Sequence, residues 1–280
     1  CQPAGKYLGE AFHRAGGIPG VVRELLGAGR IHGDAMTVSG RTVAENQADV
    51  PEPDREVIYA YKKPMKEQAG FLVLSGNLFD AALIKTCVIS DEFRARYLAE
   101  PGNENVFVSR VIVFEGPEDY RERLNDPSLE IDDSCMLVIR GCGPIGYPGS
   151  GEVVNMQPPD ELLKQGIHTL PTMGDGRQSG TAASPSILNI APESAAGGNL
   201  ALLETGDEVR VDLNECRVEL MVSGEALTKR RENYTPPELR HQTPWQEMFR
   251  GCVGQLDTGA CIEFATKYRD VAGDHPRHYH

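Results

Sequence analysis

Short runs rich in Val, Ile and Leu follow one another from residue 70 to residue 223, and most are bounded by Gly, Asn or Asp. They are GFLVLSGNL, ALIKTCVIS, VFVSRVIVF, CMLVIRGC, GDEVRVDLN and CRVELMVS. Runs of this length and composition are typical of β-strands. The last two alternate apolar and polar residues around a turn at Asn214 and Glu215, which predicts a hairpin. We therefore expect a β-barrel or sandwich of about seven or eight strands over residues 67 to 270.

Short amphipathic segments separate these strands and predict helices on the outside of the barrel or sandwich. They are DEFRARYLAE, PEDYRERLN, PPDELLKQGI and GEALTKRRENY. The first thirty residues differ in pattern, because apolar residues from Val21 to Leu26 have helical spacing and Gly27 follows them. Residues 51–66 carry three prolines among charges and read as a linker. The expected domains are residues 1–66, which include the linker, and residues 67–280.

Composition restricts the possible partners. With 280 residues, 40% of them hydrophobic, the chain is long enough to bury a core. A formal net charge of −13 argues against an extended nucleic-acid surface. No apolar run is long enough for a membrane helix, and the first residues do not resemble a signal peptide. Seven cysteines without CxxC spacing favour a reducing compartment, so we expect a cytoplasmic protein. Cys135 and Cys142, the nearest pair, are expected to be buried hydrophobes.

The stretch TMGDGRQSGTAASPS, residues 172–186, combines three glycines with five hydroxyl side chains. It follows the apolar piece IHTLPTM and precedes SILNIAPESAAGG, so we interpret it as a strand-to-helix turn. Exposed main-chain N–H groups at such a turn favour an anion. Ser179 and Thr181, two positions apart, are placed to address one ligand together. The alternative is an ordinary polar loop whose hydroxyls cap a helix.

A second glycine-rich loop, RGCGPIGYPGSGEVVNM at residues 140–156, also follows a predicted strand. It contains one carboxylate, Glu152, among apolar neighbours. A carboxylate held by a rigid loop is a suitable magnesium ligand, but Glu152 could equally be a helix-capping residue. The residues alone leave both interpretations open.

Ordered segments spanning nearly the whole chain resemble the dihydroxy-acid and sugar-acid dehydratase family. They are GKYLGEAFHRAGGIPGV, GRIHGDAMTVSGRTVAEN, SGNLFDAALIK, GPIGYPGSGEVVNM, GDGRQSGTAASPSILNIAPESAAGG and VSGEALTKRR. The forms GPIGYPG and RQSGTAASPSILN are most similar to the sugar-acid branch, whose members act on arabinonate or xylonate. The resemblance implies an α/β fold with a barrel-like C-terminal domain of the swivelling β/β/α type and short helices. A remnant of an α/β N-terminal domain would precede it.

The resemblance also implies a hydro-lyase that converts a small-molecule sugar acid to its 2-keto-3-deoxy acid. It implies an iron–sulfur cluster, by analogy with the sugar-acid branch a two-iron cluster, and Mg²⁺. Residue by residue, Ser179 matches the catalytic base, Thr181 a substrate-binding hydroxyl and Glu152 a magnesium ligand. A homodimer or homotetramer is expected for the full-length form.

The chain departs from the family in lacking the motifs of its N-terminal half, which include the cluster cysteines and further magnesium carboxylates. We therefore expect a C-terminal fragment that needs the missing half as its partner and that is inactive and free of a cluster by itself. Two alternatives are a non-catalytic binding module derived from a dehydratase and a branched-chain dihydroxy-acid dehydratase. Neither nucleic acid nor membrane is expected as a partner.

Overall fold

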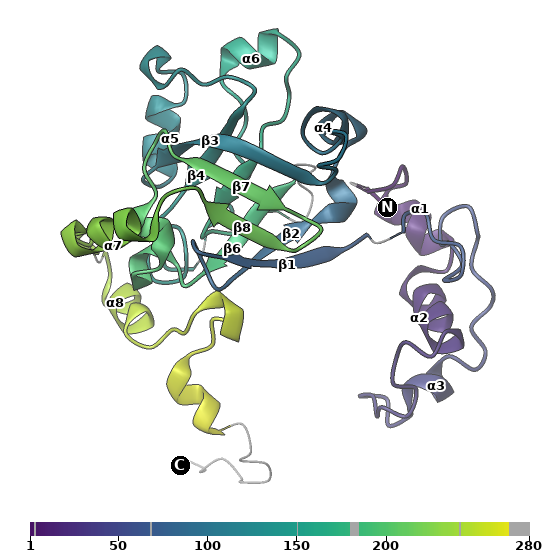
Figure 1. Ribbon diagram of the computed structural model, residues 1–280. Coiled ribbons are helices and arrows are strands. Elements are labelled where there is room, and N and C mark those ends of the chain that lie inside the picture. The colour runs from purple at the N-terminus through teal and green to yellow at the C-terminus, as the bar shows by residue number, and fades with distance from the viewer. Residues whose placement is uncertain (3, 68, 150, 180–184, 241, 269–280) are drawn as a thin grey trace, which may run out of the picture. The chain divides into compact units, whose positions relative to one another are not determined.

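The computed structural model describes residues 1–268 except residues 3, 68, 150, 180–184 and 241 (Figure 1). The chain forms two compact units, residues 1–69 and residues 70–280. Within the described part, no helix is long and apolar enough to cross a membrane.

The first unit contains three helices, α1 (Gly9–Arg14), α2 (Gly17–Gly27) and α3 (Val43–Asn46). Helix α2 covers the apolar residues whose spacing predicted it, and that prediction is confirmed. Its buried Gly20 lies against Pro53, where an added Cβ would come within 3.0 Å of the proline Cβ. Helix α3 begins with a capping box, in which Thr42 and Glu45 each bond the main chain of the other. Local caps and close glycine packing therefore define this small unit.

The second unit is a closed barrel with the strand order β1-β2-β6-β5-β4-β3-β7-β8. Its strands are β1 (Phe71–Gly76), β2 (Ala81–Lys85), β3 (Val106–Phe114), β4 (Cys135–Ile139), β5 (Thr172–Gly174), β6 (Ser186–Ala191), β7 (Glu208–Asp212) and β8 (Arg217–Leu220). The expected barrel is confirmed, and so is the β7–β8 hairpin, in which Asp212 pairs with Arg217.

Closure of the barrel depends on a short parallel pairing between β1 and β8. Asn77, directly after β1, extends this pairing with its side-chain amide. Its Nδ2 donates to the main-chain oxygen of Leu220 at 2.9 Å, and its Oδ1 accepts from the Leu220 N–H at 2.7 Å. One side chain thus satisfies both main-chain groups of a strand residue.

Four neighbouring strands, β3, β4, β5 and β6, run parallel to one another. Strand β4 is buried on both faces: Met136 and Val138 contact the barrel interior, while Leu137 and Ile139 belong to a second apolar cluster outside the barrel. This explains why its sequence is a continuous apolar run without alternation. The carboxyl ends of these four strands form one edge of the barrel, from which the glycine-rich loops extend.

Short helices surround the barrel strands (Figure 1). They are α4 (Asp91–Tyr97), α5 (Pro117–Arg123), α6 (Asp160–Lys164), α7 (Gly224–Asn233) and α8 (Pro244–Arg250). Helices predicted from the sequence at α4 to α7 are confirmed. The described residues also form six 3-10 helices: Thr86–Val88, Pro127–Leu129, Ser194–Ala196, Asn199–Leu202, Leu256–Thr258 and Glu263–Tyr268.

The interpretation of residues 172–186 as a strand-to-helix turn is wrong. The segment after this loop forms strand β6, which pairs with β5 on one side and β2 on the other. Five of its six residues are buried, so no alternation of polar residues marked it as a strand. The loop therefore connects two adjacent parallel strands.

Candidate active site

A charged residue stands directly after three of the four parallel strands, and another stands two positions after the fourth. Glu115 follows β3, Arg140 follows β4, Asp175 follows β5 and Glu193 follows β6 after Pro192. Because the carboxyl ends of parallel strands meet at one edge, the four side chains gather there, and this edge is the usual place for a ligand in α/β folds.

Asp175 ties the two glycine-rich loops together. Its carboxylate is fully buried and accepts hydrogen bonds from the N–H groups of Gly141 at 3.1 Å and Cys142 at 2.8 Å. It also accepts from the N–H of Ser194 at 3.0 Å and from its Oγ at 2.6 Å. Burial raises the pKa of Asp175, and the donated hydrogen bonds oppose that rise. The start of the 140–156 loop is thus fixed to the GDG segment.

Glu193 organises the next part of the same loop. It is fully buried and accepts from the N–H groups of Ile145 and Gly146, both at 2.9 Å, and from the Gln255 side chain, also at 2.9 Å. Burial raises the pKa of this carboxyl as well. Gly143 packs against it so closely that an added Cβ would lie 2.4 Å from Glu193 Oε2. The GPIG turn therefore requires glycine for space.

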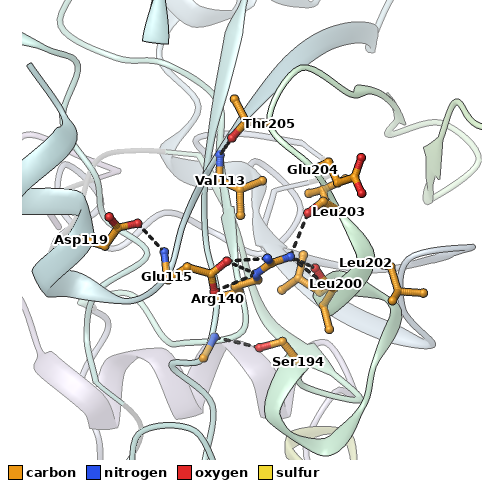
Figure 2. Close-up of polar contacts among 12 residues, drawn as sticks. Val113, Glu115, Asp119, Arg140, Ser194, Leu200, Leu202, Leu203, Glu204 and Thr205 are labelled. Carbon is orange, nitrogen blue, oxygen red and sulfur yellow. Dashed lines mark hydrogen bonds and ion pairs between the residues drawn. The ribbon is translucent and has the colours of Figure 1, made fainter. Parts of the chain in front are cut away.

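Arg140 is held by several structural contacts (Figure 2). Its Nη1 donates to the main-chain oxygens of Leu200, Ala201 and Leu203 at 2.8 to 3.1 Å, and its Nε donates to Glu115 at 3.0 Å. A cavity of about 450 Å³ lies beside it, and the described lining of that cavity includes neither Glu152 nor Ser179. Arg140 therefore supports the barrel edge, with most of its guanidinium donors engaged by the main chain and by Glu115.

Glu152 lies in contact with the segment that carries Ser179. Residues 152 and 177 form an isolated parallel bridge, with the Arg177 N–H donating to the Gly151 oxygen at 3.2 Å. Arg177 Nη1 also forms an ion pair with Glu152 Oε1 at 2.6 Å. Glu152 does not cap a helix, which was one of the two interpretations of this residue, because it lies in an extended bridge.

Ser179 follows Arg177 by two positions and is half-buried. The intervening Gln178 is buried, and its side-chain amide donates to Ser186 Oγ at 2.8 Å. Thr181 lies outside the described residues. The structure thus brings the segments of Glu152 and Ser179 together on one edge, with the Ser179 main chain anchored by a buried neighbour.

The described residues do not by themselves fit a magnesium ion or an iron–sulfur cluster. Magnesium requires several oxygen ligands in octahedral arrangement, and clusters are held by groups of cysteine thiolates. Outside the gaps noted above, no group of three or more His, Cys, Asp or Glu side chains is placed to hold a metal. Cys135 and Cys142 are free and buried in the apolar cluster outside the barrel, as expected for small hydrophobes.

Sequence reasoning missed Asp175, Glu193 and Arg140. The available signal was a single charged residue at or just beyond the end of an apolar run, as in MGDG and IAPES. That signal becomes informative only when the strands are known to be parallel neighbours, and the sequence does not show strand order.

The second unit is thus a closed β-barrel domain in which glycine-rich loops at the carboxyl ends of parallel strands are held by buried carboxylates. The chain belongs to the dihydroxy-acid/6-phosphogluconate dehydratase family, since the model of the family's C-terminal domain matches residues 56–260 and that of its N-terminal domain matches residues 1–46.

Relatives in this family are dehydratases. The chain is 60% identical over 279 residues to a D-xylonate dehydratase of Caulobacter vibrioides, covering 100% of this chain and 47% of that protein. It is 37% identical to an L-arabinonate dehydratase of Rhizobium leguminosarum, covering 94% and 44%. It is 34% identical to a dihydroxy-acid dehydratase of Methylibium petroleiphilum, covering 94% and 45%. The chain spans about half the length of the curated relatives it matches.

Proposed function

We propose that this chain supplies the base-bearing half of a sugar-acid dehydratase acting on xylonate, arabinonate or a related acid. The observation that carries the proposal is the direct contact between the Glu152 and Arg177–Ser179 segments, in a chain 60% identical to a D-xylonate dehydratase. The identity of 60% to a D-xylonate dehydratase, against 34% and 36% to dihydroxy-acid dehydratases, supports a sugar acid over a branched-chain substrate.

In the proposed reaction Ser179 Oγ removes the proton from C2 of the acid, and the C3 hydroxyl leaves with a proton as water. The resulting enol tautomerises to the 2-keto-3-deoxy acid, so atoms balance without an oxidant or reductant. Thr181 would hold the substrate. Support comes from the 152–177 bridge, which holds the chain two residues before the serine, and from Gln178, which is buried directly next to it.

We propose Mg²⁺ and an iron–sulfur cluster, with two irons as the finer proposal, as the cofactors of the whole protein. Glu152 is the carboxylate that this chain would contribute to magnesium, and the other ligands would come from residues outside this chain. Residues 1–66 would be the last part of the N-terminal domain and its linker. The remainder of that domain is then the partner that completes the site, within a homodimer or homotetramer.

The experiment that tests the proposal is Ser179→Ala in the full-length, cofactor-loaded enzyme. Loss of a positioned base typically lowers kcat about 10² to 10⁴-fold. Ser128→Ala, which changes an exposed serine in the 3-10 helix Pro127–Leu129, is the matched control and should leave turnover unchanged. If Ser179→Ala kept near-parental turnover and near-parental exchange of the C2 proton with deuterated solvent, another group would be the base.

A further inference from the structure

Lys85 is a buried lysine at the end of strand β2. Along this strand Ala82 and Ile84 point into the barrel interior, whereas Leu83 packs against the apolar cluster outside the barrel. Strand alternation places Lys85 on the same face as Leu83. Only 8% of Lys85 is exposed. Lysine is seldom buried to this degree unless its ammonium has a defined partner.

One partner of this ammonium is the residue proposed as the base. Lys85 Nζ donates to the main-chain oxygen of Ser179 at 3.2 Å. The topology explains the contact, because β2 pairs antiparallel with β6, with Ile84 opposite Ile187. The end of β2 therefore lies beside the start of β6, where the chain arrives from Ser179.

This contact provides what a serine base requires. A serine hydroxyl ionises far above neutral pH, so it becomes a base only when a neighbouring group stabilises its anion. The carbonyl carbon and the Cβ of Ser179 are attached to the same Cα, so the hydrogen bond on the carbonyl oxygen restrains the residue that carries Oγ and keeps a cation beside its main chain. Because only 8% of Lys85 is exposed, its ammonium is poorly hydrated, and this burial lowers the pKa of Lys85. Charges interact more strongly in such surroundings.

We propose that Lys85 is a positioning residue for Ser179, holding its main chain and stabilising the alkoxide form of its side chain by charge. The inference rests on the proposed function, because it assigns Lys85 a role only if Ser179 is the base. Lys85 would act through Ser179 and would not contact the substrate itself.

A double-mutant cycle in the full-length, cofactor-loaded enzyme tests the role. Lys85→Met keeps the apolar stem and removes the ammonium. We expect kcat to fall about 10 to 100-fold, the loss typical of residues that support a functional group, while KM stays within about threefold. Lys85→Arg, which retains the charge, should recover part of kcat. Lys164→Met, which removes an exposed lysine from α6, is the control and should match the parent.

The decisive comparison is the effect of Lys85→Met in the Ser179→Ala background. If Lys85 acts through Ser179, adding Lys85→Met to Ser179→Ala should lower neither the residual kcat nor the C2-proton exchange rate any further. Equal losses in both backgrounds would overturn the proposal, as would parental kcat in Lys85→Met beside a large loss in Ser179→Ala. Near-parental turnover in Ser179→Ala would instead overturn the proposed function itself. Should Lys85→Met fail to fold, Lys85→Gln takes its place in the same cycle with the same criteria.

Discussion

Arg177 and Glu152 form a half-exposed ion pair, with 50% and 44% of their side chains accessible, that joins the two glycine-rich loops. Pairs with this exposure contribute about 0 to 1 kcal/mol to stability. The buried Asp175 holds the same two loops together through Gly141 and Cys142, and the buried Glu193 holds the 140–156 loop through Ile145 and Gly146. Substitutions of Asp175 or Glu193 should therefore lower the free energy of unfolding, whereas substitution of Glu152 should leave it nearly unchanged.

Glu152→Gln should leave folding intact and weaken the response to magnesium. We expect the free energy of unfolding of the chain to change by less than about 1 kcal/mol, because the lost pair is solvated. In the full-length enzyme, more magnesium should be needed for half-maximal turnover. Glu161→Gln, which removes the exposed partner of Lys164, is the control for losing a surface ion pair. An unchanged magnesium requirement would exclude Glu152 as a ligand.

Asp175→Asn should destabilise the barrel unit by about 1.5 to 3 kcal/mol, the range for hydrogen bonds to charged groups. All four donors on Asp175 point at its oxygens, so the amide of asparagine must face an N–H group, such as that of Cys142. Urea unfolding measures the change. Asp257→Asn, at an exposed aspartate of the same unit, should stay within about 0.5 kcal/mol. Equal stability of the two variants would contradict the assigned role of Asp175.

Glu193 should give stability a measurable pH dependence. Its pKa is raised by burial, so the folded state binds the proton more tightly than the unfolded chain. Its contribution to stability is then complete below the unfolded pKa of about 4.3 and is lost as pH rises through the folded pKa.

Replacing Glu193 by Gln removes this titration. The difference in unfolding free energy between the parent and Glu193→Gln should therefore fall as pH rises above about 4, by at most about 1.4 kcal/mol per pH unit. Denaturant unfolding from pH 4 to pH 8 measures it, with the exposed Glu238→Gln as the control for losing one carboxylate. A difference that grew with pH would show that the pKa of Glu193 is lowered.

Gly143→Ala should destabilise the unit by about 1 to 3 kcal/mol, because the new methyl would overlap the buried Glu193 carboxylate. Gly224 in α7 is the matched control, since an added Cβ there would meet nothing within 4 Å. Gly224→Ala should be neutral or stabilise by about 0.4 to 1 kcal/mol. Similar unfolding midpoints for the two variants would mean that the loop around Gly143 adapts easily.

The sequence allowed prediction of elements that have a clear apolar period or a continuous apolar run between turn residues. The alternation of apolar and polar residues in β7 and β8 predicted their hairpin, and the apolar spacing around Val21 predicted α2. Strand β6 was missed because its apolar residues follow a loop rich in glycine and hydroxyl side chains and lead directly into APESAAGG, so the segment was interpreted as the start of a helix. Glu152 and Ser179 could be chosen from loop composition and family motifs, whereas the roles of Asp175 and Lys85 depend on strand order, which local pattern does not contain.

Asn77 and Leu220, the residues that complete the β1–β8 pairing, stand 143 positions apart. The seam of the barrel is thus made by segments that emerge from the ribosome at very different times. Until residue 220 is available, β1 has β2 beside it but lacks its other neighbour, and its main-chain groups on that side need a temporary partner. Pairings with such wide separation in sequence form slowly, so the barrel is expected to be completed late during synthesis and to be sensitive to strand exchange between chains before then.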